Sequence, residues 1–212
     1  MKENIKLYKR AYQLSLFTIF YNIGEGLISL LVGYHDETLT LFGFGIDSFI
    51  EVISAVGIAV MISNIRQNPD SKKYKFEIKA LKITGLCFYL LSAGLLIGII
   101  LTIIQKHKPE TTFWGIVISI VSIIVMIWLM YAKKNVGNSL NSEPIISDSN
   151  CTKICVYMSI VLLVSSLIYE LTGFVYADTI GAAGLTYFSF MEGKEAFEKA
   201  EAKSVNEDKI QV

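Results

Sequence analysis

The sequence has little charge, and this shortage limits where most of the chain can lie. Only 18% of its 212 residues are Asp, Glu, Lys or Arg, whereas 53% are hydrophobic. A water-soluble domain needs a larger polar share to cover its surface. The composition therefore argues against an ordinary soluble protein and indicates a lipid environment.

Cysteine and histidine are also scarce. The three cysteines, Cys87, Cys151 and Cys155, lie inside or at the ends of hydrophobic runs, and an odd set at such positions is not a disulfide framework. The two histidines, His35 and His107, fall between these runs and form no metal-binding motif. The sequence shows no Ser-His-Asp arrangement and no nucleotide-binding loop. We therefore expect that the chain is not an enzyme.

Long hydrophobic runs make up most of the chain. A helix needs roughly 20 mostly apolar residues to cross the hydrocarbon core of a membrane. Six such runs are bounded by charged or turn residues: 11–33, 39–65, 82–105, 113–131, 151–173 and 174–192. We predict an all-α membrane protein, a six-transmembrane-helix bundle. Residues 1–200 would form this domain, and residues 201–212 would form a short charged cytoplasmic tail.

Basic residues gather on one side of the predicted bundle. They precede the first run and occupy the two longer connections, 66–81 and 132–150, including Lys133 and Lys134. The opposite side has only Lys106 and Lys108. By the positive-inside rule both termini are cytoplasmic, and we expect the cell membrane as the location. The basic residues thus orient the helices and do not indicate a nucleic-acid partner.

Two carboxylates lie inside the second run. Asp47 and Glu51 are four residues apart, so they share one helix face about one turn from each other. Like charges this close in a low dielectric repel unless a cation or protons neutralise them. A protonated, hydrogen-bonded structural pair is the alternative, although a single polar residue would serve that purpose at lower cost. The pair therefore favours a cation site.

A second pair with the same spacing opens the fifth run. Cys151 and Cys155 share a helix face, and two thiolates with two carboxylates would suit a soft or borderline divalent metal. Cysteine is also common in packed interiors, so packing stays open for this pair. Cys87 is unpaired in the third run, and we interpret it as a packing residue.

Other polar residues in or beside the runs could line an ion pathway or support a metal site. Ionisable groups at membrane depth are costly and are functional candidates for that reason. Capping or bridging of neighbouring helices would explain them equally well. These residues are Asn22, Glu25, Asp148, Asn150 and Asp178.

The pattern resembles the transmembrane domain of the cation diffusion facilitators over roughly residues 11–200. Three segments carry the resemblance: Asp47-Ser-Phe-Ile-Glu51, Ser147-Asp-Ser-Asn-Cys151 and Tyr176-Ala-Asp-Thr-Ile-Gly181. Members of that family are six-helix transporters that exchange cytoplasmic divalent metal for protons. The resemblance implies this fold and this activity. We expect the family's C-terminal cytoplasmic domain to be absent, which leaves open whether the chain forms a homodimer.

The resemblance also implies a ligand set. In the family, two acids of the second helix and a His-x-x-x-Asp pair of the fifth helix bind the metal. Asp47 and Glu51 match the acids, and Cys151 and Cys155 stand at the positions of the other pair. The two cysteines thereby become expected ligands. Because sulfur departs from the family pattern, we expect zinc, cadmium or a similar divalent ion as substrate, and no prosthetic group.

The resulting hypothesis is a secondary transporter that exports a divalent transition metal in exchange for protons across the lipid bilayer. Helix groups would rock around an ion held between the second and fifth helices. A thiol keeps its proton near neutral pH until a metal displaces it, which couples the two ions. Two alternatives remain: a membrane thiol-disulfide redox protein that uses Cys151 and Cys155, and a transport-incompetent metal-binding membrane protein.

Overall fold

The computed structural model describes residues 2–35, 39–67, 73–105, 113–172 and 176–210. This part of the chain forms six α-helices. They are α1 (Lys2–His35), α2 (Leu39–Gln67), α3 (Lys73–Gln105), α4 (Phe113–Leu140), α5 (Glu143–Thr172) and α6 (Ala177–Ile210). The predicted all-α, six-helix fold is confirmed.

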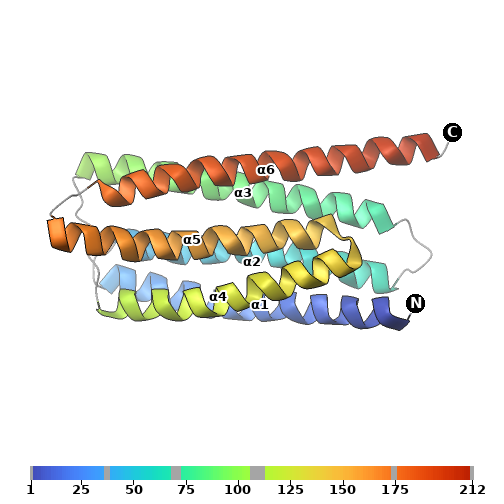
Figure 1. The fold of residues 1–212 in the computed structure, drawn as a ribbon, viewed down its shortest axis with the longest axis horizontal. Coiled ribbons are helices and arrows are strands. Elements are labelled where there is room, and N and C mark those ends of the chain that lie inside the picture. The colour runs from blue at the N-terminus through green and yellow to red at the C-terminus, as the bar shows by residue number, and fades with distance from the viewer. Residues whose placement is uncertain (1, 36–38, 68–72, 106–112, 173–175, 211–212) are drawn as a thin grey trace.

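The helices run side by side along an elongated bundle (Figure 1). The most extensive contacts join α1 with α2, α3 with α6, and α4 with α5. In Figure 1, α2 and α5 occupy the middle of the bundle, between α3 and α6 on one side and α1 and α4 on the other. These two central helices also contact each other. Both termini lie at the same end of the bundle (Figure 1), as an even number of passes requires.

Four helices are long and apolar enough to cross a membrane, judged on the described residues. The candidate spans are Ile5–Val32, Phe44–Gln67, Lys75–Ile104 and Ile116–Leu140. Many large apolar side chains on these helices point outward, as Leu31, Ile104 and Ile124 do. Such an exterior suits lipid contact, because lipid does not penalise exposed hydrocarbon as water does.

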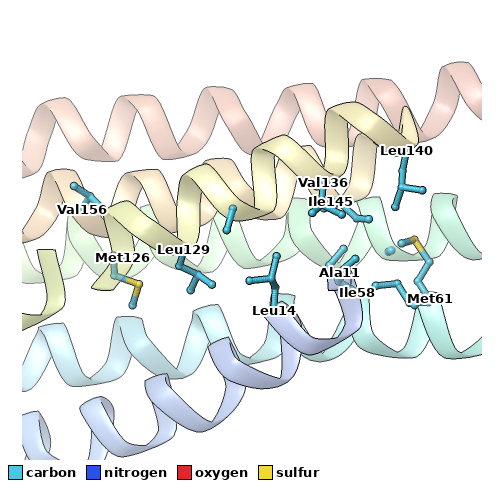
Figure 2. Close-up of a cluster of buried hydrophobic side chains, with 13 residues drawn as sticks. Ala11, Leu14, Ile58, Met61, Met126, Leu129, Val136, Leu140, Ile145 and Val156 are labelled. Atoms are coloured by element: carbon cyan, nitrogen blue, oxygen red, sulfur yellow. The ribbon is translucent and has the colours of Figure 1, made fainter. Parts of the chain in front are cut away.

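An apolar cluster fills the bundle where α1, α2, α4 and α5 meet (Figure 2). Its labelled members are Ala11, Leu14, Ile58, Met61, Met126, Leu129, Val136, Leu140, Ile145 and Val156. The four residues from α4 recur at helical spacing and extend well past Tyr131. The predicted end of the fourth helix near residue 131 is therefore wrong: α4 runs to Leu140 because its inward apolar stripe continues that far.

A two-residue turn replaces most of the loop expected over 132–150. Asn141 adopts a left-handed conformation with a φ of 47°, which asparagine tolerates better than most residues. The Ser142 N–H donates to Gly137 O at 3.0 Å, and the Asn141 N–H donates to Asn138 O at 3.1 Å. This pair of bonds is the Schellman pattern that ends a helix. The turn makes α4 and α5 an antiparallel hairpin and brings the last turns of α4 beside the first turns of α5.

Two glycines allow a close crossing of α1 and α2. A Cβ atom added to Gly26 would lie 3.1 Å from the carbonyl oxygen of Gly45, and one added to Gly45 would lie 3.0 Å from that of Gly26. Both distances are tighter than ordinary contacts, so a larger residue at either position would push the helices apart. The crossing brings the polar residues of α1 close to α2.

Candidate functional site

The four predicted ligands are buried in the region between α2 and α5. Glu51 is fully buried, and Asp47, Cys151 and Cys155 are each at most 8% exposed. Cys155 lies within electrostatic range of Glu51, Cys151 and Asp47. The spacing of four residues therefore turns both pairs inward from adjacent helices, as we expected from the sequence.

These side chains are neighbours without forming a closed coordination sphere. Among the described residues, no group of three or more His, Cys, Asp or Glu side chains is gathered closely enough to hold a metal ion. The ligand set stays a prediction, and binding would require the side chains to move closer together. The structure does show which atoms are available for this.

Glu51 has one oxygen engaged and one oxygen free. The hydroxyl of Thr152 on α5 donates a hydrogen bond to Glu51 Oε1. Its other oxygen, Oε2, is buried and has no hydrogen-bond partner. A buried carboxylate oxygen without a donor is costly. This atom is therefore placed to accept a cation or a proton.

A lysine lies directly beside this carboxylate. Lys133 of α4 is 2% exposed, and its Nζ atom is 2.8 Å from Asp148 Oδ2 and 3.6 Å from Glu51 Oε1. It also donates to Thr152 Oγ1 at 3.0 Å. Lys133 was expected in a loop between the fourth and fifth helices, and that expectation is wrong, because the residue lies on the inward face of α4.

Asp148 is held by a second helix as well. Ser54 of α2 donates to Asp148 Oδ1 at 2.7 Å. Since the single hydroxyl proton of Ser54 is used there, Thr84 of α3 donates to Ser54, at 3.2 Å. Both oxygens of Asp148 are thus satisfied, by Lys133 on one side and Ser54 on the other. Asp148 therefore holds Lys133 in place, and neither of its oxygens is free to bind a metal.

The polar candidates of α1 form a neighbouring group. Tyr21 donates to Glu25 Oε1 at 3.1 Å, and Ser48 of α2 donates to Glu25 Oε2 at 3.2 Å. Glu25 also lies within electrostatic range of Glu51. Asn22 is fully buried one turn away, and neither polar atom of its side chain has a hydrogen-bond partner. The group connects α1 electrostatically to Glu51 of α2.

The remaining candidates differ in position. Asn150 donates to Glu192 Oε2 of α6 at 2.9 Å, so it joins α5 to α6 and does not face the acids of α2. The Asp178 side chain lies outside the described residues. Cys87 packs in a cluster of buried residues that includes Ile154 and Cys151, which agrees with its interpretation as a packing residue.

Ion pairs fasten the last turns of α6 to the bundle. Lys203 pairs with the buried Glu77 of α3 at 2.8 Å, and Lys199 pairs with Glu143 of α5 and with Glu195, each at 2.9 Å. Burial acts to lower the pKa of Lys199, but its hydrogen bonds to Glu195 and Glu143 and their negative charges raise this pKa above its ordinary value. The helix therefore continues through the predicted tail as far as Ile210, and residues 211 and 212 lie outside the described part.

Lys133 and Thr152 are the site residues that sequence reasoning missed. A signal for Lys133 was present, because it continues the buried stripe of α4 in phase: Met126, Leu129, Lys133, Val136 and Leu140 are spaced by three or four residues. Its neighbour Lys134 falls off this stripe and is exposed. The phase of the apolar pattern thus separates the buried lysine from the exposed one.

Comparison with known proteins agrees with this architecture. The family description of the cation efflux transmembrane domain matches residues 15–200, which include parts of all six helices. An uncharacterized transporter of Methanocaldococcus jannaschii is 25% identical in an alignment 221 positions long, which covers 92% of this chain and 76% of that protein. The chain is thus a multi-pass membrane transporter and not an enzyme. With its six helices and the matched domain, it belongs to the cation efflux family.

Proposed function

We propose that the chain exports a divalent transition-metal cation, zinc, cadmium or a similar ion, in exchange for protons. The observation that carries the proposal is the buried Glu51 Oε2 atom, which has no hydrogen-bond partner. Its carboxylate lies one helical turn from Asp47 and within electrostatic range of the two thiols of α5. Family membership supports cation efflux in general. The ligand types support the metal class, because thiolates prefer soft and borderline ions.

In this proposal Asp47, Glu51, Cys151 and Cys155 converge on the ion. Asp47 is suited to move, because it has no hydrogen-bond partner among the described residues, whereas the hydroxyl of Thr152 holds Glu51 in place. The cysteines hold protons in the metal-free state and release them when sulfur binds the metal. The basic residues at the end of the bundle that carries both termini support a cytoplasmic position for this end, by the positive-inside rule.

The test is transport by the purified protein in liposomes that contain a pH-sensitive dye. Cadmium or zinc added on one side should drive proton movement in the opposite direction. Asp47→Asn keeps the size of the side chain and removes its charge, so this variant should insert and purify normally but lose metal-driven proton movement. Glu198→Gln is the matched control, because its side chain is 64% exposed on α6.

Two results would contradict the proposal. One is no metal-driven proton movement by the parent protein with any divalent ion of a panel. The other is transport by Asp47→Asn at the rate of the parent, which would mean that the second helix is not the metal pathway.

A further inference from the structure

The bundle contains a buried cation that metal binding by acids and thiols does not explain. Lys133 is 2% exposed and is the sole lysine or arginine among the buried residues of the described chain. Taking an ammonium group out of water is costly even when it is paired. In a membrane protein a buried ionisable residue is a functional candidate for that reason.

The ammonium group of Lys133 lies closer to its partners on α5 than to Glu51 on α2. Nζ is 2.8 Å from Asp148 and 3.0 Å from Thr152, which are hydrogen-bond distances. It is 3.6 Å from Glu51, which is too long for a good hydrogen bond but well within ion-pair range. The ammonium is therefore anchored on α5 and reaches across to α2. Thr152 connects the two sides, because it accepts from Lys133 and donates to the same Glu51 oxygen.

The ammonium group and a divalent cation would compete for the same carboxylate. Lys133 pairs with Asp148 and also lies within ion-pair range of Glu51. A dication at Glu51 and an ammonium 3.6 Å from the same carboxylate would repel each other strongly. Asp148 and Thr152 can retain the ammonium while it gives up Glu51.

We propose that Lys133 is the resident counter-cation of the site. Its ammonium group neutralises Glu51 while no metal is bound, withdraws onto Asp148 and Thr152 when a divalent cation binds, and returns when that cation leaves. The inference rests on the proposed function and assigns Lys133 an affinity-setting role within it. Competition from the ammonium weakens metal binding and assists release, so that acids and thiols do not trap the ion.

The experiment is a cadmium titration of the purified full-length chain in detergent. Lys133→Leu removes the charge and adds no sulfur ligand, and it should bind cadmium at least ~10-fold more tightly than the parent, because a nearby positive charge is gone. Lys133→Arg retains the charge and should bind like the parent. Lys134→Leu is the matched control: this neighbouring lysine is exposed, and the variant should also bind like the parent.

A second variant covers the case in which Lys133→Leu does not fold. Lys133→Leu with Asp148→Asn removes both charges of the pair, and it should still bind cadmium more tightly than the parent. If the parent binds cadmium and the neutral variants that fold bind it no more tightly, the counter-cation role is overturned while the proposed function stands. If the parent binds neither cadmium nor zinc, the proposed function itself fails, and the inference fails with it.

Discussion

Removing one partner of the Lys133–Asp148 ion pair should destabilise the bundle much more than removing both. The two side chains are 2% and 1% exposed and are 2.8 Å apart. At an effective dielectric of about 20, Coulomb attraction at this distance is roughly 6 kcal/mol. Loss of one partner of a buried pair typically costs about 3–5 kcal/mol, because the other charge is left uncompensated.

The two single substitutions should destabilise the bundle by different amounts, because the remaining partners differ. After Asp148→Asn, Lys133 still has Glu51 at 3.6 Å and the hydroxyl of Thr152, so the loss should be about 3 kcal/mol. After Lys133→Met, Asp148 retains only the neutral hydroxyl of Ser54, so the loss should approach about 5 kcal/mol. The double variant has no orphaned charge and should lie within about 1–2 kcal/mol of the parent.

The assay is a denaturant titration of the purified variants in mixed micelles, followed by far-ultraviolet circular dichroism. Lys199→Met is the control: it removes a lysine that is 29% exposed and pairs with Glu143 at 2.9 Å, and such a pair contributes only about 0–1 kcal/mol. Additive single effects in the double variant, or single effects as small as that of the control, would refute the reasoning.

Three further predictions concern the ligands and the end of α6. Replacing Cys151 by His and Cys155 by Asp should shift preference from cadmium toward zinc or manganese; equal metal affinities in the double variant and the parent, measured by calorimetry, would show that the thiols are not ligands. Glu51→Gln should leave insertion intact but abolish metal-driven proton movement in liposomes, because it removes an anionic ligand; transport at the parental rate would argue against a role for this carboxylate. Lys203→Met should speed amide hydrogen exchange in the last turns of α6, since its pair with the buried Glu77 at 2.8 Å is lost; unchanged exchange would mean that the pair does not hold this end in place.

Most of the fold could be predicted because hydrophobic length is a strong signal in membrane proteins. All six helices follow from the apolar runs. Their ends are less predictable, because a helix can continue into water on an amphipathic face. Val136 and Leu140 keep α4 helical beyond the lysines that were expected to end it, and ion pairs do the same for the last turns of α6.

The site was only partly predictable, for a physical reason. The shared faces of Asp47 with Glu51 and of Cys151 with Cys155 follow from helical periodicity within one helix. The bond from Thr152 to Glu51 joins residues 101 positions apart, and that from Ser54 to Asp148 joins residues 94 positions apart. Periodicity gives the face of a helix but not the residue it meets across the bundle, so these partners required the three-dimensional structure.

The thiols and the lysine would act on the charge of this site in different ways. If a divalent cation binds and both thiols lose their protons, the two positive charges gained equal the two lost, so the buried charge does not change. A change in buried charge is costly in a low dielectric, and this exchange avoids one. Neutral ligands in place of the thiols could not release protons. Lys133 acts separately, because its ammonium group offsets one negative charge among the buried carboxylates whether or not a metal is bound.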